Sequence, residues 1–138
     1  MKVKEAMAKT IVTAQPKESV VDVARKMKQE DTGFVPVTEG GRLVGVVTDR
    51  DIVVKCLAEG HDVRSETADH VMSTGVVTVS PEDDLEKAGE KMSSDEIRRL
   101  PVVENGKLVG VLSQGNLVQA TGDSGPGKKA TLGVTRGA

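Results

Sequence analysis

The stretch Leu43-Val44-Gly45-Val46 recurs as Leu108-Val109-Gly110-Val111, 65 positions further along the chain. Sliding the chain along itself by this distance produces further matches without a gap, and a repeat at one fixed spacing indicates two homologous units. The matched pairs are Met7 with Met72, Thr13 with Thr78, Pro16 with Pro81, Met27 with Met92, and Pro36 with Pro101.

The repeat divides the chain into two units of similar length. We predict the first unit at residues 1–60, a polar linker at 61–67, the second unit at 68–122 and a flexible Gly-rich tail at 123–138. A unit of this size buries little core on its own. We therefore expect the two units to pack against each other with pseudo-two-fold symmetry.

Hydrophobic period predicts the order strand, helix, strand, strand, helix in each unit, which is an α/β (α+β) fold class. Apolar residues at helical spacing follow Ser19, and the pair Ser19 and Asp22 resembles a capping box. Asn105-Gly106 is typical of a hairpin turn. In the first unit the predicted strands cover residues 11–14, 34–37 and 43–47, and each has a counterpart in the second unit, that of the first strand being 76–79. The last helix of each unit is predicted at 49–59 and at 114–121.

Composition excludes several classes of protein. The 138 residues carry a net charge of −2, one Cys, one Phe, and neither Trp nor Tyr. A single Cys allows no internal disulfide and is typical of a reducing compartment, so we expect a cytoplasmic protein. The chain contains no apolar run long enough for a membrane span or an export signal. Low charge and few aromatic residues make nucleic acid improbable as the primary ligand.

Signatures of catalysis or metal binding are weak. Cys56, His61 and His70 have no nucleophile–base spacing and no common zinc spacing, so we predict neither an enzyme nor a metal site. The segment Gly122-x4-Gly127-Lys128 resembles a phosphate-binding loop but lacks the required Ser or Thr and follows a helix. We interpret it as part of the tail.

Candidate binding residues occupy equivalent places in the two units. Thr48-x-x-Asp51 ends a strand with a hydroxyl and adds a carboxylate one turn later, which is suited to the hydroxyls of a ribose. The same pattern is also a capping box, which needs no ligand. Arg50 is suited to a phosphate. In the second unit Ser113-x-x-Asn116 replaces the carboxylate with an amide, a weaker acceptor.

Two further features accompany this pattern. Pro36 and Pro101 interrupt apolar strands, which would leave neighbouring backbone groups free or place them at a sheet edge, and free groups could recognise a base. Arg98-Arg99 have no counterpart in the first unit and could clamp a phosphate, although a solvated turn or a salt bridge explains them equally well.

These motifs together resemble a tandem pair of cystathionine-β-synthase (CBS) domains over about residues 3–120. The elements that carry the likeness are a Met before a short strand, a hydrophobic-x-Pro-Val strand, a Gly-containing hairpin, a Leu-Val-Gly-Val strand and [Ser/Thr]-x-x-[Asp/Asn], all of which occur twice. The run Thr48-Asp49-Arg50-Asp51-Ile52-Val53-Val54-Lys55 further resembles small stand-alone proteins of the hypoxic-response type.

The resemblance implies a β-α-β-β-α unit in each half, a homodimer, and two clefts that bind AMP, ADP, ATP or S-adenosylmethionine. It places Thr48 and Asp51 at the ribose, with Ser113 and Asn116 as counterparts. It places the adenine near the main chain of Gly33, Phe34 and Val35 and around Thr10 and Val12.

We therefore expect a non-catalytic regulatory module, active in energy sensing or stress response, that requires no cofactor and acts through an unidentified protein partner or a change in assembly. The alternative is a ligand-free structural or dimerisation module.

Overall fold

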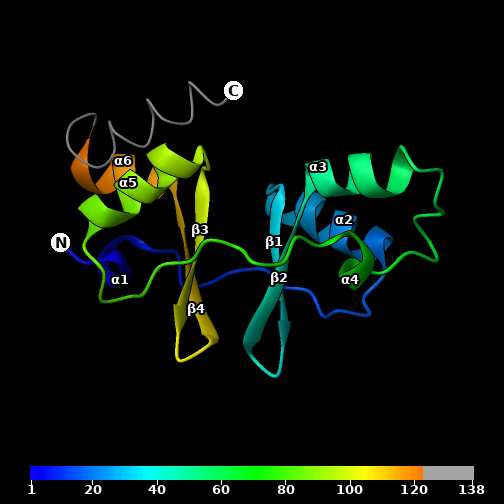
Figure 1. Ribbon diagram of the computed structural model, residues 1–138, viewed down its shortest axis with the longest axis horizontal. Coiled ribbons are helices and arrows are strands. Elements are labelled where there is room, and N and C mark those ends of the chain that lie inside the picture. The colour runs from blue at the N-terminus through cyan, green and yellow to red at the C-terminus, as the bar shows by residue number, and fades with distance from the viewer. Residues whose placement is uncertain (123–138) are drawn as a thin grey trace. The chain divides into compact units, whose positions relative to one another are not determined.

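A computed structural model describes residues 1–122, which form two compact units (Figure 1). The central unit is Val12–Val76, and the split unit combines Met1–Ile11 with the chain from Val77 onward. The tail predicted at 123–138, including the segment that resembles a phosphate-binding loop from residue 123 onward, lies outside the described residues.

The central unit contains one antiparallel hairpin and its covering helices. Its elements are α2 (Val20–Glu30), β1 (Phe34–Glu39), β2 (Arg42–Thr48), α3 (Asp49–Asp51), η1 (Ile52–Leu57) and α4 (Ala68–Val71). Gly40 and Gly41 form the turn with φ angles of 59° and 82°, values that non-glycine residues rarely adopt. The helices lie on one side of the hairpin (Figure 1).

The split unit repeats this arrangement. Its elements are α1 (Val3–Ala6), α5 (Leu85–Asp95), β3 (Arg99–Glu104), β4 (Lys107–Ser113) and α6 (Gln114–Thr121). Asn105 and Gly106 turn the β3–β4 hairpin with φ angles of 54° and 81°, as the Asn-Gly pair predicted.

Each unit has its own apolar core. In the central unit Val23, Val35 and Val47 are fully buried, and in the split unit Met92 and Leu100 are fully buried. The Val and Leu residues come from the strand faces and helix stripes that the hydrophobic period had identified. The predicted mixed α+β class is thus confirmed.

The strands predicted at 11–14 and 76–79 are wrong as extended strands. Each contributes one parallel β-bridge, Ala14 with Val37 and Val79 with Val102. A proline follows each bridge by two residues, and proline offers no N–H to continue a ladder. The amide of Ala14 donates to the Pro36 carbonyl at 3.0 Å, so this carbonyl has a backbone partner.

The helix predicted at 49–59 is also different. Three α-helical residues lead into the π-helix η1, in which the amide of Ala58 donates to the Val53 carbonyl five residues earlier at 2.8 Å. The segment includes the β-branched run Ile52-Val53-Val54, whose α-helix propensity is low. Cys56 is thereby fully buried.

The short helices α1 and α4 were not predicted. Because of where these segments pack, the boundaries of the compact units differ from those of the sequence repeats. Met7, at the start of the first repeat, places its sulfur where a side chain on Gly110 would lie. Met72, at the start of the second repeat, does the same at Gly45. Each repeat therefore begins with a segment that packs in the unit formed mainly by the other repeat.

Candidate functional site

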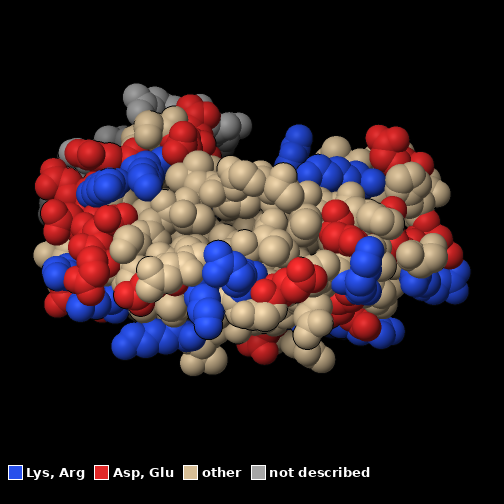
Figure 2. Space-filling model, turned by 60° about the horizontal axis from the view of Figure 1, so that its bottom comes forward, with Lys and Arg blue, Asp and Glu red and all other residues tan. Residues whose placement is uncertain are grey.

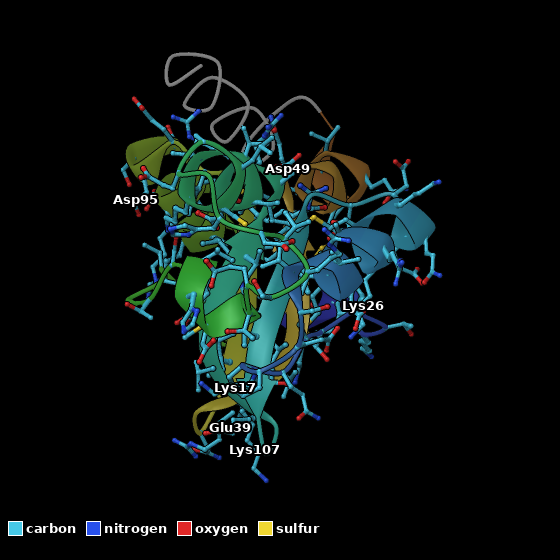
Figure 3. The ribbon with its side chains drawn as sticks, turned by 90° about the vertical axis from the view of Figure 1, so that its right-hand side faces the viewer. Lys17, Lys26, Glu39, Asp49, Asp95 and Lys107 are labelled. Carbon is cyan, nitrogen blue, oxygen red and sulfur yellow. The ribbon has the colours of Figure 1, made fainter. Side chains whose placement is uncertain are left out.

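Thr48 and Asp51 lie where β2 ends and α3 begins. The Thr48 hydroxyl accepts the amide of Asp51 at 3.1 Å, and Asp51 Oδ2 accepts the amide of Thr48 at 2.8 Å. This reciprocal pair is a complete capping box. It holds the carboxylate in one orientation at the end of the hairpin opposite the turn; Asp49 marks that end and Glu39 the turn in Figure 3.

Asp51 is the one charged residue that is buried among residues 1–122, with 8% of its surface exposed. Its second oxygen, Oδ1, lies 3.1 Å from Lys55 Nζ and 3.4 Å from Ser73 Oγ. A buried carboxylate is retained at low cost only when it is paired and hydrogen-bonded. Neither partner was predicted from the sequence, although the four-residue spacing from Asp51 to Lys55 is a helical ion-pair signal.

The split unit has an uncharged version of the same junction. The amide of Ser113 donates to Asn116 Oδ1 at 2.9 Å, and the amide of Asn116 donates to Ser113 Oγ at 3.0 Å. The repeat spacing aligns Lys55 with Ala120 and Ser73 with Ala8. The carboxylate, the ammonium and the hydroxyl of the central unit are therefore all absent from the equivalent positions.

Gly33 joins the start of β1 to the Thr48–Asp51 junction. Its carbonyl accepts the amide of Asp49 at 3.0 Å, and a Cβ at Gly33 would lie 2.6 Å from the Asp49 carboxylate. Phe34 is half-buried, whereas the Val35 side chain is fully buried in the core. The Val35 side chain is therefore not accessible to a ligand.

Thr10 and Val12 fall in different compact units. Thr10 is exposed in the split unit, while Val12 is half-buried against the core of the central unit. Within the central unit, the structure brings Gly33 and the Thr48–Asp51 junction together through the backbone bond to Asp49.

The arginines are divided between the units in the same way. Arg50 is exposed at α3 of the central unit, and its amide donates to Asp49 Oδ1 at 2.9 Å. Arg98 and Arg99 belong to the split unit, where the Arg98 carbonyl accepts the amide of Gln114 at 2.7 Å. This bond mirrors the one between Asp49 and Gly33.

The two histidines considered for a metal meet a carboxylate instead. Nδ1 of His61 and Nδ1 of His70 each contact one oxygen of Glu66, whose pKa is lowered mainly by the hydrogen bond from His70. Burial raises the pKa of the Cys56 thiol. Over residues 1–122, His, Cys, Asp and Glu form no group of three or more with the arrangement that holds a metal ion.

Comparison with known sequences decides the family. The CBS domain matches residues 3–57 and 68–123. The chain belongs to the CBS domain family. The CBS pair is a regulatory, non-catalytic module, and the predicted absence of enzymatic activity agrees with relatives named as CBS domain proteins.

Relatives support the tandem arrangement. The CBS domain-containing protein YhcV of Bacillus subtilis is 39% identical over 115 residues, which are 83% of this chain and 81% of YhcV. Hypoxic response protein 1 of Mycobacterium tuberculosis is 30% identical over 103 residues, which are 74% of this chain and 72% of that protein. The likeness to the hypoxic-response type is thus confirmed.

Solved structures of similar chains share this fold, and they differ in the ion or ligand that they contain. Hypoxic Response Protein I, with two coordinated zinc ions, matches at a TM-score of 0.80 and 27% identity over 86% of this chain and 98% of that one. CBSX2 in complex with AMP matches at a TM-score of 0.77 and 28% identity over 86% of this chain and 94% of that one.

Surface charge and hydropathy give two further observations. Figure 2 shows Lys and Arg interspersed with Asp and Glu over the face that it presents. No helix in residues 1–122 is long and apolar enough to cross a membrane.

Proposed function

We propose that this CBS pair binds an adenosine-containing nucleotide, AMP, ADP, ATP or S-adenosylmethionine, and regulates a partner protein or its own assembly in response. The observation that carries the proposal is the buried Asp51 carboxylate, held by the Thr48 amide at the open end of the hairpin. A carboxylate accepts the two hydroxyls of a ribose through short, charge-assisted hydrogen bonds. The AMP complex of CBSX2 supports this class of ligand.

The other ligand groups are assigned from the remaining candidates. We propose that the main chain of Gly33–Val35, with Thr10 and Val12, recognises adenine. Arg50 or the Arg98-Arg99 pair binds phosphate, because guanidinium groups match phosphate geometry. The two CBS domains are proposed to pack around a pseudo-two-fold axis that creates two clefts. The cleft with Ser113 and Asn116 binds nucleotide more weakly, since an amide is a weaker acceptor than a carboxylate.

Calorimetric titration with each nucleotide tests the proposal. Asp51→Asn keeps a side chain that can cap the helix but removes the charge, and we expect it to weaken binding about tenfold, on the order of the added strength of one charged hydrogen bond. Ser19→Ala is the matched control, because Ser19 caps α2 through an equivalent bond to the amide of Asp22 at 3.1 Å. This control should lose stability and keep its affinity.

Two outcomes would contradict the assignment in different ways. Unchanged affinity in Asp51→Asn removes Asp51 from the ribose site. Absence of binding by the unsubstituted protein favours the ligand-free structural module. An ultraviolet spectrum of purified protein adds a direct check, because a chain without Trp or Tyr contributes little absorbance beside a bound adenine.

We further propose a homodimer formed through η1. Val53, Val54 and Leu57 are exposed by 53%, 43% and 64%, which is unusual for neighbouring large apolar side chains. An apolar cavity of about 270 Å³ lies between α2 and the following segments, lined chiefly by Val20, Val21, Ala24, Ile52 and Val63. A second copy that covers both surfaces would remove this apolar area from water.

Sedimentation velocity tests the dimer. Leu57→Lys should shift the protein from dimer to monomer, because it places a charge in the apolar contact. Gln29→Lys adds the same charge at an exposed position of α2 that does not line the cavity, and it should leave the dimer intact. A monomeric unsubstituted protein, or a dimeric Leu57→Lys variant, would contradict this interface.

A further inference from the structure

Lys55 makes a set of contacts that the nucleotide proposal does not use. Its ammonium lies 3.1 Å from Asp51 Oδ1, 3.2 Å from Ser73 Oγ and 3.2 Å from the carbonyl of Val71. A lysine ammonium has three N–H donors. Each donor therefore has an acceptor, although 42% of the side chain remains exposed.

These contacts occupy the carboxylate that is proposed to hold the ribose. A carboxylate offers about four acceptor positions on its two oxygens. In Asp51 the Thr48 amide uses one position on Oδ2, while Lys55 and Ser73 use the positions on Oδ1. A ribose with two adjacent hydroxyls needs two positions, so one of the existing partners must leave.

The second half of the chain shows that the junction does not need the lysine. There Asn116 forms the same capping box with Ser113, with Ala120 and Ala8 at the positions equivalent to Lys55 and Ser73. The ammonium and the hydroxyl are thus absent where the carboxylate is absent. Lys55 is therefore linked to the charge of Asp51 and not to the formation of the cap.

We propose that Lys55 is an autoinhibitory latch, an ammonium that occupies the Asp51 carboxylate in the ligand-free protein and is displaced when a ribose binds. This inference rests on the proposed function, since it concerns the same carboxylate. The latch lowers nucleotide affinity by competition. An exposed ion pair is screened by salt, so the competition weakens as ionic strength rises.

Adenosine is the probe for the first test, because it carries the ribose without a phosphate, whose negative charge would itself attract the Lys55 ammonium. In calorimetric titration, Lys55→Met should bind adenosine about three- to fivefold more tightly than the unsubstituted protein, in line with the strength of partly exposed ion pairs. The unsubstituted protein should bind adenosine more tightly as salt is added. Lys55→Met should show little salt dependence.

Lys26→Met is the matched control in the same unit. Lys26 also pairs with a carboxylate, Glu18 at 2.7 Å, and donates to the carbonyl of Thr13 at 2.8 Å. Its removal changes the net charge by the same amount without freeing Asp51. Adenosine affinity and its salt dependence should therefore remain those of the unsubstituted protein.

A second variant guards against a folding defect. Ser73→Ala removes one anchor of Lys55 and reproduces the residue of the other half of the chain, so it should tighten adenosine binding in the same direction. Equal or weaker binding by both variants overturns the latch while the nucleotide proposal stands. If neither the unsubstituted protein nor either variant binds adenosine or a nucleotide, the two proposals fail together.

Discussion

Gly45→Ala should destabilise the central unit because no space exists for the added methyl group. An alanine Cβ at this position would lie 2.7 Å from Met72 Sδ and 2.9 Å from the carbonyl oxygen of Ser73. The Met72 side chain is flexible and can move. The Ser73 carbonyl is backbone and cannot move freely, since Ser73 exchanges two hydrogen bonds with Val46, at 3.0 and 2.9 Å.

The size of the effect follows from these contacts. Moving Ser73 away breaks two backbone hydrogen bonds, each with a net value of about 1 kcal/mol, and this loss falls within the range of about 1–3 kcal/mol that overpacking typically costs. We therefore expect the free energy of unfolding to fall by about 2 kcal/mol. Urea unfolding followed by far-ultraviolet circular dichroism is the suitable assay, because the chain has neither Trp nor Tyr for fluorescence.

Two variants make this measurement specific. Gly110→Ala should give a similar loss in the split unit, where the added Cβ would lie 2.9 Å from the Ala8 carbonyl. Gly115→Ala should instead stabilise α6 by up to about 1 kcal/mol, because its nearest neighbour is an ordinary 3.6 Å away. If Gly45→Ala is as stable as the unsubstituted protein, the close approach of Met72 and the Ser73 carbonyl to Gly45 is refuted.

Three further predictions follow from the described contacts. Lys2 and Lys4 lower the pKa of Glu82 from 4.5 to about 2, so its contribution to stability is present above pH 4.5 and is lost as the pH falls toward 2; Glu82→Gln should flatten this acid-side decline in thermal melts. Ser113→Ala should lower the free energy of unfolding by about 1 kcal/mol through loss of the cap, and an unchanged urea midpoint would contradict it. Cys56 is fully buried with a raised pKa, so a thiol reagent should modify it slowly in the native protein and rapidly in urea; equal rates would contradict its burial.

The predictions from sequence were accurate where the interaction is local. Asn105-Gly106 forms the predicted turn, and the hydroxyl of Ser19 caps α2 as its spacing indicated. Such features depend on residues within one turn of each other, so their pattern is complete in a short window. The Thr48–Asp51 pair belongs to this class as a cap, and its role at a ribose stays a prediction.

The errors concern the backbone hydrogen bonds that two segments make. Ile11–Ala14 has the apolar character of a strand, but pairing stops after Ala14, and the helix after Asp51 widens into a π-helix that buries Cys56. Apolar character and period do not reveal how many backbone partners a segment will find.

The fixed repeat, the hairpin turns and the helix caps are enough to identify two homologous CBS units from the amino-acid sequence alone. The packing of Met7 at Gly110 and of Met72 at Gly45, and the contact of Ser73 with the Asp51 carboxylate, are known only from the tertiary structure. A glycine in a strand signals a close approach without naming its partner. The physical reason is that these contacts join segments far apart in the chain, and only the folded backbone brings them within hydrogen-bonding or van der Waals distance.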